Sequence, residues 1–339
     1  MRFDEQDNGA AGDEGFTDHL DPAGIEALGA AFRRWQDASG RPATWLARAR
    51  VLALFLLLRH TGAKLSEVLE LDLARDLDLD AGLVRFGERD AIVSDAGRRD
   101  LAGIIPPILE RGGVGKLGID PGYCRRVFAE RGAEAGLSRD LSNPSSLRRY
   151  RAIELSMLGA PESVVRRILG RKQPPGPSVI SDRDALAATE HYSRRALSGA
   201  TSARNSFFGK VERVGAGDIQ SVVELRTISG SRVSAVITNE SVMRLKLAPG
   251  AWITALVKAP WVIVAKGKNP PATSSENALA GRVARIEYGL NTAEIVMELT
   301  DKSMLCAMAG RDAADALALQ PGDAVWALFS AYAVILSAQ

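Results

Sequence analysis

Apolar residues recur at helical spacing along the first part of the chain. Intervals of three and four residues place the apolar positions of Pro22–Ala38 and of Trp45–His60 on one face, which predicts two helices. The same spacing predicts further helices over Ser66–Leu73, Tyr123–Ala135, Ser146–Leu158, Glu162–Leu169 and Ala185–Leu197. Short apolar runs within Leu77–Ile92 predict a small hairpin, and the prolines of Arg171–Pro177 predict a loop.

Near residue 200 the spacing changes, because apolar residues begin to alternate with polar ones. Val233, Ala235 and Ile237 show the two-residue period, and glycines punctuate the runs. Successive side chains of a β-strand point to opposite faces of the sheet, so this period predicts strands with one buried face. We therefore expect a mainly helical N-terminal part and a C-terminal part of β-strands.

The β-rich part contains an internal repeat at an offset of 72 residues. Gly209 recurs as Gly281 and Arg213 recurs as Arg285, and 16 of the 60 positions from 205 to 264 are identical to their counterparts without a gap. Such a repeat is typical of a duplicated structural unit. It predicts two modules, residues 202–267 and 275–338, joined by a linker that contains two prolines.

The composition is typical of a folded protein without a membrane span. Hydrophobic residues make up 46% of the chain and charged residues 25%, and the net charge is +2. The longest apolar run, Val51–Leu58, is far shorter than the roughly 20 residues that a membrane-spanning helix needs, so it predicts a buried helix. Residues 1–21 are acidic and glycine-rich, which predicts a disordered tail.

Two further observations concern the cellular compartment. The N-terminus lacks the basic-then-apolar pattern of a signal peptide, so a cytoplasmic location is expected. Cys124 and Cys306 lie far apart and lack the spacing of metal ligands, so both are expected to be buried thiols.

The two copies of the repeat differ in residues that carry charge or hydroxyl groups. The differing pairs are Arg204 against Glu276, Thr238 against Gly310, Ser241 against Ala313, and Lys258 against Ser330. A tetrahedral dianion needs positive charge and many N–H or O–H donors. Copy one has two cations and two hydroxyls at these positions, whereas copy two has no cation and one hydroxyl. Copy one is therefore the candidate oxyanion site; the alternative is that these residues are ordinary solvated side chains at strand ends.

Four segments of copy one carry a family signature: Ser202–Asn205, Val236–Val242, Leu245–Gly250 and Val257–Val262. They resemble the oxyanion-binding Mop (TOBE) module, and the tandem pair resembles the C-terminal half of the molybdate-responsive ModE regulators. The resemblance implies an OB-like β-barrel for each copy, with tungstate or molybdate bound between modules of different subunits. It implies that the metal is bound only as the oxyanion, by Ser202, Ala203, Arg204, Thr238, Ser241, Lys258 and Ala259.

Three segments of the helical part carry a second signature: Leu58–Leu71, Leu147–Arg171 and Thr189–Tyr192. They resemble the tyrosine recombinases, or phage integrases, whose chemistry needs two arginines, acid/base groups and a tyrosine nucleophile. Arg148 and Tyr192 match that pattern, whereas three positions depart from it, namely Lys64 at the first arginine and Ser145 and Arg171 at histidines. The resemblance implies a degenerate recombinase domain, residues 22–198, that binds DNA without cutting it, so no catalytic residue is expected.

Basic residues cluster between Arg139 and Lys172, where eight arginines and lysines face only three acidic residues. In a nearly neutral chain such clustering fits contacts to DNA phosphates, although a solvated helix face is the alternative. The expected DNA contacts are Lys64, Arg148, Arg149, Arg166, Arg167, Arg171 and Lys172.

The two resemblances together are those of tungstate-responsive transcriptional regulators of the TunR type. They predict a multidomain chain with a mainly α integrase-like domain and two OB-like β-barrel modules. The expected function is that of a homodimer that binds an inverted repeat in a double-stranded operator and responds to tungstate or molybdate. An active recombinase with an oxyanion-binding regulatory domain and an oxyanion storage protein remain alternatives. A transporter ATPase is excluded because no G-x-x-x-x-G-K-[ST] loop occurs.

Overall fold

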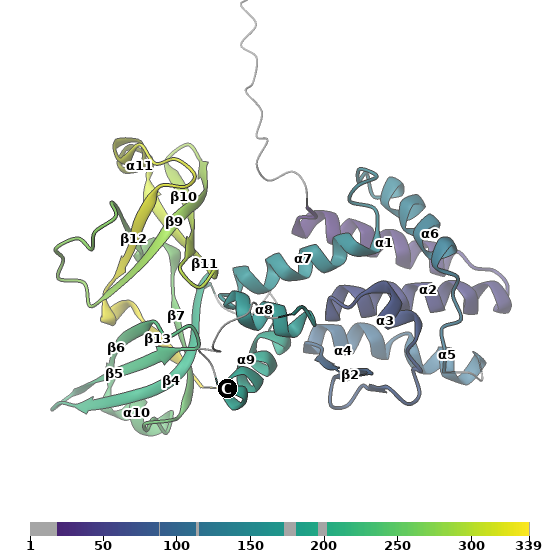
Figure 1. Cartoon of the computed structure of the whole chain (residues 1–339), viewed down its shortest axis with the longest axis horizontal. Helices are drawn as coiled ribbons and strands as arrows, with labels where there is room; N and C mark the ends of the chain where they lie inside the picture. The colour runs from purple at the N-terminus through teal and green to yellow at the C-terminus, as the bar shows by residue number, and fades with distance from the viewer. Residues whose placement is uncertain (1–18, 88, 113–114, 173–180, 196–201, 339) are drawn as a thin grey trace, which may run out of the picture. The chain divides into compact units, whose positions relative to one another are not determined.

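The computed structural model describes residues 19–87, 89–112, 115–172, 181–195 and 202–338. The chain forms two compact units, one of Met1–Asp76 with Asp100–Arg151 and one of Leu77–Arg99 with Ala152–Gln339. Figure 1 labels most of the helices and strands of both units. The integrase-like domain expected over residues 22–198 is thus divided between the two units.

The first unit is helical and is built around α2 (Pro42–Thr61). The apolar run Val51–Leu58 within α2 is buried throughout, as predicted. Phe32, Phe55 and Phe128 pack together with ring centroids 4.5 to 6.1 Å apart. These three rings join α1 (Pro22–Asp37), α2 and α6 (Pro121–Glu134) into one core. The other helices with residues in this unit are α3 (Leu65–Leu69), α4 (Asp95–Ala102), α5 (Ile105–Gly112) and α7 (Pro144–Met157).

The start of α1 corrects the boundary of the predicted tail. Leu20 is buried, and the Asp21 carboxylate accepts a hydrogen bond from the Gly24 N–H at 2.6 Å. An acidic residue in this position caps the first turn of the helix, and Pro22 follows at a position where its missing N–H costs nothing. Leu20 and Asp21 therefore belong to the folded unit, and residues 1–18 of the predicted tail lie outside the described residues.

Most helices predicted from the sequence are present; one is shorter than predicted, and two further helices are present that were not predicted. The helix predicted over Ser66–Leu73 covers only Leu65–Leu69, because the apolar residues beyond it pack from a turn. Helices α4 and α5 were not predicted; α4 has Leu101 as its only large apolar residue and therefore shows no helical period. In α5 the adjacent Pro106 and Pro107 obscure the pattern.

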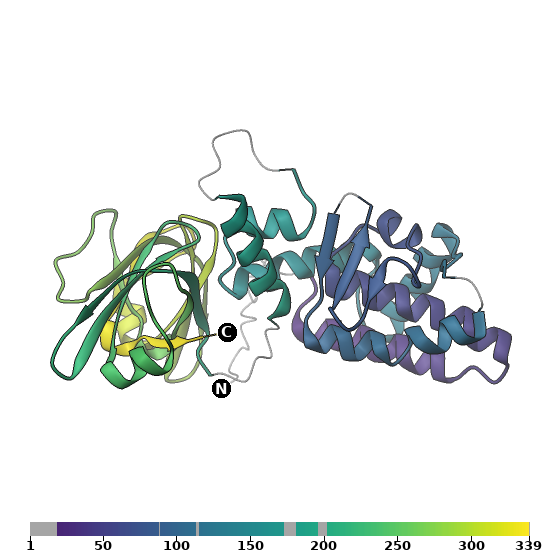
Figure 2. The same ribbon diagram turned by 90° about the horizontal axis from the view of Figure 1, so that it is seen from below.

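The second unit begins with a small antiparallel sheet, in the order β1 (Leu77–Asp78), β2 (Leu83–Phe86) and β3 (Arg89–Ile92) (Figure 2). It confirms the hairpin predicted for this segment. The helices α8 (Glu162–Ile168) and α9 (Asp182–Arg194) also belong to this unit. The loop predicted over Arg171–Pro177 lies outside the described residues from residue 173 onward.

The duplicated part repeats one order of elements twice, and each element of copy two begins 72 residues after its counterpart. Copy one consists of β4 (Asn205–Ala216), β5 (Gln220–Thr227), β6 (Arg232–Thr238), α10 (Asn239–Arg244), β7 (Trp252–Val257), η1 (Ala259–Trp261) and β8 (Ile263–Lys266). Copy two consists of β9 (Asn277–Tyr288), β10 (Thr292–Leu299), β11 (Met304–Gly310), α11 (Arg311–Leu317), β12 (Ala324–Phe329), η2 (Ala331–Ala333) and β13 (Ile335–Ser337). The structure confirms the predicted duplication.

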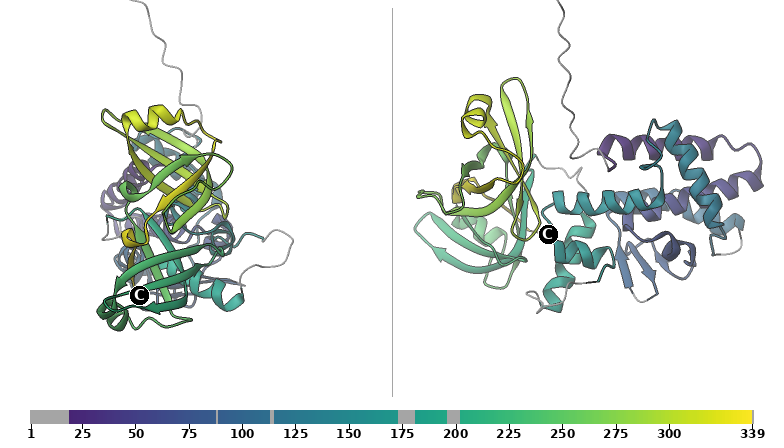
Figure 3. Two further views of the ribbon diagram at one scale, coloured as in Figure 1. Left: turned by 90° about the vertical axis from the view of Figure 1, so that its left-hand side faces the viewer. Right: turned by 45° about the horizontal axis from the view of Figure 1, so that its top comes forward.

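The two copies exchange their last strands. The sheet orders are β13-β7-β4-β5-β6 and β11-β10-β9-β12-β8, so β13 pairs with β7 and β8 pairs with β12. Figure 1 shows β13 beside β7, and Figure 3 shows the two curled sheets from other sides. One hydrophobic core contains Leu225 and Val233 of copy one together with Ile295 and Met297 of copy two. The two repeats are therefore interlocked halves of one folded pair.

Two expectations about the whole chain can be compared with the structure. In the described part of the chain, no helix is long and apolar enough to span a membrane. Cys124 and Cys306 are both buried, as predicted. Burial raises the pKa of Cys124 to about 12 and that of Cys306 to about 11, so both remain protonated thiols at neutral pH.

Candidate oxyanion-binding site

The residues predicted to bind an oxyanion lie at strand ends of copy one. Ser202–Arg204 immediately precede β4, Thr238 ends β6, and Lys258 and Ala259 follow β7. Strand ends are held by the ladder hydrogen bonds of the sheet, so they fix the side chains that they carry. Arg204 and Thr238 are exposed, whereas Lys258 is half-buried and Ala259 is buried.

Two asparagines that recur in the repeat join the copies. The Asn205 amide donates to the Cys306 carbonyl at 2.8 Å, and its oxygen accepts from the Cys306 N–H at 2.7 Å. Asn277 makes the same pair of hydrogen bonds with the backbone of Ser234, at 3.0 and 2.7 Å. These bonds fix the start of β4, next to Arg204, against β11 of copy two.

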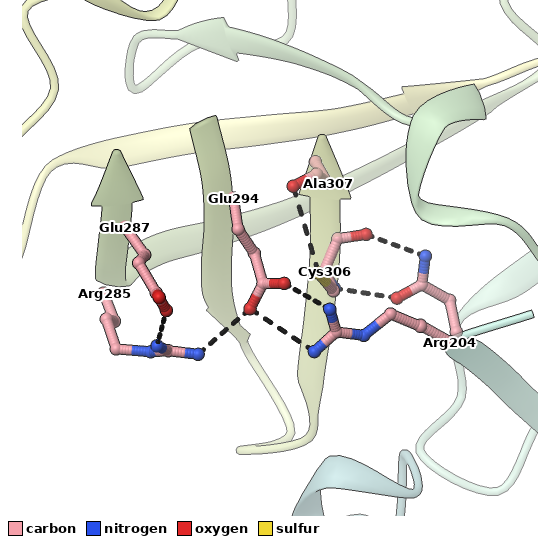
Figure 4. Close-up of polar contacts among 7 residues, drawn as sticks. Arg204, Arg285, Glu287, Glu294, Cys306 and Ala307 are labelled. Atoms are coloured by element: carbon pink, nitrogen blue, oxygen red, sulfur yellow. Dashed lines mark hydrogen bonds and ion pairs between the residues drawn. The ribbon is translucent and has the colours of Figure 1, made fainter. Parts of the chain in front are cut away.

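Arg204 contacts a carboxylate of copy two (Figure 4). Its guanidinium forms an ion pair with Glu294 of β10 through Nη1, and Nη2 donates to the same carboxylate at 3.3 Å. Arg285 of β9 also donates to Glu294 at 3.0 Å, and it donates to Glu287 at 2.6 Å. The four side chains therefore alternate in charge, and two oxygens of Glu294 occupy the fork of Arg204.

Copy two replaces the arginine with an acid that acts as an internal anion. Glu276, the counterpart of Arg204, accepts hydrogen bonds from the Ala331 N–H at 2.8 Å and from the Ser330 hydroxyl at 3.3 Å. The hydrogen bond from the Ala331 N–H is the main cause that lowers the pKa of Glu276. The fold thus presents backbone and side-chain donors to a carboxylate at this place.

In copy one the corresponding places are those of Arg204, Lys258 and Ala259, because every element has the same 72-residue offset. The Lys258 ammonium lies 5.2 Å from the centroid of the Trp261 ring. At these places copy one therefore has two cationic side chains and the turn at Ala259, whereas copy two has the carboxylate of Glu276. Copy one thus presents cations that attract an anion at these places, whereas in copy two Glu276 accepts the local hydrogen bonds and repels anions.

Thr238 and Ser241 form a local cap. The Thr238 hydroxyl accepts from the Ser241 N–H at 3.2 Å and donates to the Ser241 hydroxyl at 3.0 Å. These bonds cap α10, whereas α11 of copy two begins at Gly310 without a side-chain cap. Both hydroxyls therefore have a structural role whether or not they also bind a ligand.

The predicted ligands divide between two contact regions of the interlocked pair. Arg204, Lys258 and Ala259 lie where η1 packs against β11, whereas Thr238 ends β6, which packs against η2. Among the described residues, no hydrogen bond or ion pair joins Thr238 or Ser241 to Arg204 or Lys258. The structure brings together one half of the predicted ligand set and does not bring the other half to it.

The recombinase-like positions of the first unit lie at the start of α3 and in the first turns of α7. Arg148 donates from Nη1 to the Gly62 carbonyl at 2.7 Å, next to the turn that carries Lys64. The Lys64 N–H donates to Glu67 at 2.6 Å at the start of α3. The Ser145 hydroxyl donates to Asn143. The structure thus brings Arg148 and Lys64 to the same turn, with Arg148 half-buried there.

Tyr192, at the nucleophile position, is buried in the second unit. Only 1% of it is exposed, and its hydroxyl donates to the Gly159 carbonyl at 3.0 Å. Burial raises the pKa of Tyr192, so the phenolate that would attack a phosphate is strongly disfavoured. Its neighbour His191 stacks on Phe208 at 4.0 Å, and burial lowers the pKa of His191 to about 3. Both side chains act as packed core residues in this structure.

The basic residues predicted to contact DNA differ in exposure. Arg149 is exposed in the first unit, and Arg167, Arg171 and Lys172 are exposed in the second. Arg166 is half-buried and forms an ion pair with Glu162 at 2.6 Å. Arg151, which contributes to the basic cluster in the sequence, is buried and is therefore not part of a DNA-facing surface.

The contacts of Glu294 and Glu276 were not predicted from the sequence. Glu294 of copy two aligns with Val222 of copy one at the 72-residue offset, so an acid replaces an apolar residue within the strand pattern. That substitution is the signal available in the sequence. Arg204, which contacts Glu294, lies 90 residues away along the chain, so only the fold brings the two side chains together. In the described residues, no group of three or more His, Cys, Asp or Glu side chains is placed to hold a metal ion.

The architecture of the duplicated part agrees with a known class of domain. Residues 201–264 and 273–336 match the model of the TOBE domain family. The C-terminal part of this chain therefore matches a tandem pair of TOBE domains, as the four segments of copy one predict.

Individual relatives share this part of the chain. The chain is 39% identical over 137 residues to the molybdenum-pterin-binding protein MopA of Rhodobacter capsulatus, which covers 40% of this chain and 52% of MopA. It is 35% identical over 166 residues to the DNA-binding transcriptional dual regulator ModE of Escherichia coli strain K12, covering 47% of this chain and 60% of ModE. The chain thus spans about half the length of the curated relatives that it matches.

The helical part is similar to the solved structure of XerA recombinase. The two are 17% identical with a TM-score of 0.37, and the match covers 52% of this chain and 58% of XerA. A likeness this distant carries no argument about activity. The resemblance of the helical part to the integrases therefore depends on the sequence segments around Lys64, Arg148 and Tyr192.

Proposed function

We propose that this chain is a transcriptional regulator that binds DNA with its helical part and senses tungstate or molybdate with its TOBE pair. The observation that carries the proposal is the charge reversal between the copies. Glu276 supplies an anion to the donors of copy two, whereas Arg204 and Lys258 stand at the equivalent places of copy one. The similarity of this region to MopA and ModE supports the same class of ligand.

Binding of DNA is proposed from the exposed basic side chains and from the integrase-like segments. Arg149, Arg167, Arg171 and Lys172 are exposed and can contact phosphates. We propose that Tyr192 does not cleave DNA, because it is buried and donates to the Gly159 carbonyl. A strand-cleavage assay on the bound DNA tests this point, and any covalent DNA–protein product would favour the recombinase alternative. The storage-protein alternative leaves the exposed basic residues without a role.

The division of the predicted ligands between two contact regions favours a homodimer. Arg204 and Lys258 of one chain and Thr238 and Ser241 of another can complete one site if two TOBE pairs associate. Two identical chains related by a two-fold axis present two equivalent DNA-binding parts, which suits an operator with an inverted repeat.

The test combines ligand and DNA binding with the full chain. Calorimetric titration with tungstate, molybdate and sulfate should give tight binding of the first two anions and weaker binding of sulfate. Gel retardation with DNA from upstream of its own gene should give a specific complex whose affinity falls steeply with salt. Absence of heat with both metal oxyanions would reject the sensor, and absence of a specific DNA complex with and without oxyanion would reject the regulator.

A further inference from the structure

The cluster around Arg204 contains a carboxylate whose position has no counterpart in copy one. Glu294 lies on β10, and the residue 72 positions earlier is Val222 of β5. Copy one thus has an apolar residue where copy two has an acid. At this position of the repeat only copy two has an acid, and it contacts Arg204 of copy one; the residue equivalent to Arg204 in copy two is itself an acid, Glu276. This charge complementarity indicates that Glu294 serves Arg204.

We propose that Glu294 is a built-in competitor for the oxyanion, which occupies Arg204 in the ligand-free protein and moves to Arg285 when the oxyanion binds. The inference depends on the proposed function, because it assigns a role to Glu294 at the same site. It makes Glu294 a residue that sets the affinity of the site.

The geometry of the cluster gives Glu294 this role. Its carboxylate accepts from both terminal nitrogens of Arg204, and these are the donors that a tetrahedral oxyanion would use. The Glu294 side chain is 19% exposed, whereas that of Arg204 is 46% exposed. An anion therefore reaches Arg204 from the solvent side and meets a guanidinium that already holds a carboxylate.

Arg285 provides the place to which Glu294 can shift its contact. Arg285 already donates to Glu294 at 3.0 Å, so the carboxylate keeps a cationic partner when it releases Arg204. The second partner of Arg285 is Glu287, whose side chain is 68% exposed and can be solvated by water instead. The exchange therefore leaves no buried charge without a partner, which would otherwise oppose it strongly.

The strength of the competitor suits a reversible sensor. The Arg204 side chain of the pair is 46% exposed, so solvent screens the interaction and a dianion that accepts several hydrogen bonds can displace the carboxylate. The negative charge of Glu294 nevertheless remains close to the bound dianion and repels it. Removal of that charge should tighten oxyanion binding by about fivefold or more, through loss of the competing pair and of the repulsion.

The test is a calorimetric titration of the full-length wild type and four variants with sodium molybdate and with sodium tungstate. Glu294→Gln should tighten binding, and Arg285→Gln should weaken it because Glu294 loses its second partner. Glu298→Gln is the matched control for charge, since Glu298 lies on the same strand and pairs with Lys302. Arg213→Gln is the control for Arg285, since Arg213 is its counterpart in copy one and pairs with Glu224. Neither control should change the affinity by more than about twofold.

Each outcome has a definite meaning. Tighter binding in Glu294→Gln with weaker binding in Arg285→Gln supports the competitor. Unchanged or weaker binding in Glu294→Gln, with all proteins folded by thermal unfolding, overturns it while the proposed sensor stands. An equal gain in Glu298→Gln overturns it as well, because the effect would then be one of net charge. Absence of binding in every protein rejects the proposed function and the competitor with it.

Discussion

At the residue scale, the candidate site depends on two cations, Arg204 and Lys258. Copy two has Glu276 and Ser330 at the equivalent positions. Arg204 and Lys258 both lie on the turn regions that flank β4 and β7, and neither is part of the hydrophobic core. Their substitution is therefore expected to change ligand binding more than folding. The opposite is true of Asn205, which is buried and joins the copies through two hydrogen bonds.

Arg204→Ala and Lys258→Ala should each weaken binding of molybdate and tungstate. The loss of a charge-assisted donor to a desolvated dianion costs roughly 2–5 kcal/mol, which is about 30-fold or more in affinity. Calorimetric titration measures the affinity, and Lys302→Ala is the control because this lysine pairs with Glu298 on the surface. Wild-type affinity in either variant would remove that residue from the site.

His191 carries a second residue-scale consequence, because its pKa falls from 6.5 to about 3 through burial against Phe208. The folded protein holds His191 neutral, whereas the unfolded chain binds a proton below its ordinary pKa. Between pH 6.5 and about 3 the unfolded state therefore binds more protons, and stability falls as the pH falls. At most about 1.4 kcal/mol per pH unit comes from this group.

The variant His191→Phe keeps an aromatic ring on Phe208 but has no proton to gain. Its melting temperature should therefore fall less than that of the wild type between pH 7 and pH 5. Thermal unfolding followed by circular dichroism at each pH measures the difference. His60, whose pKa is also lowered by burial, remains in both proteins and gives the shared background. Parallel curves for the two proteins would mean that His191 titrates normally in the folded state.

At the scale of elements, the strand exchange decides how the TOBE pair holds together. β13 belongs to copy two in sequence but completes the sheet of copy one, through the pairing of Leu336 with Ala255. Leu336 is buried in the shared core, whereas its neighbour Ile335 is 45% exposed. Leu336 and Ile335 both lie on β13, but only the Leu336 side chain is buried. Substitutions at the two positions therefore distinguish the contribution of core burial from that of strand pairing.

Leu336→Ala should destabilise the whole TOBE pair by roughly 2–3 kcal/mol, within the range for a truncated buried leucine. Ile335→Ala on the same strand should cost less than about 1 kcal/mol, because its side chain contributes little to the core. Chemical denaturation of the full chain measures both values. Independent unfolding of the two copies in either variant would contradict the interlocked core.

At the scale of the whole molecule, the second unit joins helical and β elements through packed side chains. Tyr192 of α9 and Phe208 of β4 belong to one hydrophobic cluster, and Phe208 also stacks on Trp252 at 4.8 Å. Lys210 of β4 donates to Asp184 of α9 at 2.5 Å. The strand that begins beside Arg204 is therefore packed directly against α9, so a change at the candidate site can reach the helical elements through β4.

Phe208→Leu should preserve oxyanion binding but reduce the effect of oxyanion on operator affinity. Leucine retains bulk but loses the stacking on His191 and Trp252 that fixes α9 against β4. A typical coupling of about 1–3 kcal/mol would change operator affinity roughly 5- to 150-fold in the wild type, and the variant should fall towards no change. Operator affinity with and without saturating tungstate is the measurement.

A second variant, with several Gly-Ser residues inserted at Gly199, lengthens only the covalent connection between α9 and β4. If that variant loses the coupling and Phe208→Leu keeps it, the covalent connection and not the side-chain packing transmits the effect.

Several features of this protein follow from its sequence alone. Local periodicity is written in neighbouring residues, so Val51–Leu58 was identified as a buried helix and the region after residue 200 as β-strands. The duplication was equally accessible, because an offset of 72 residues is a property of the chain and survives in every element. The contrast between Arg204 and Glu276 also came from comparing the copies, which requires no coordinates.

Other features were decided by tertiary structure, because they depend on which distant residues meet. The exchange of β8 and β13 leaves no local pattern, since a strand has the same alternation whichever sheet it joins. The pairing of Arg204 with Glu294 spans 90 residues, and the burial of Tyr192 depends on Phe208 of the following domain. Spacing along the chain determines which face of an element is apolar, but packing alone determines what that face meets.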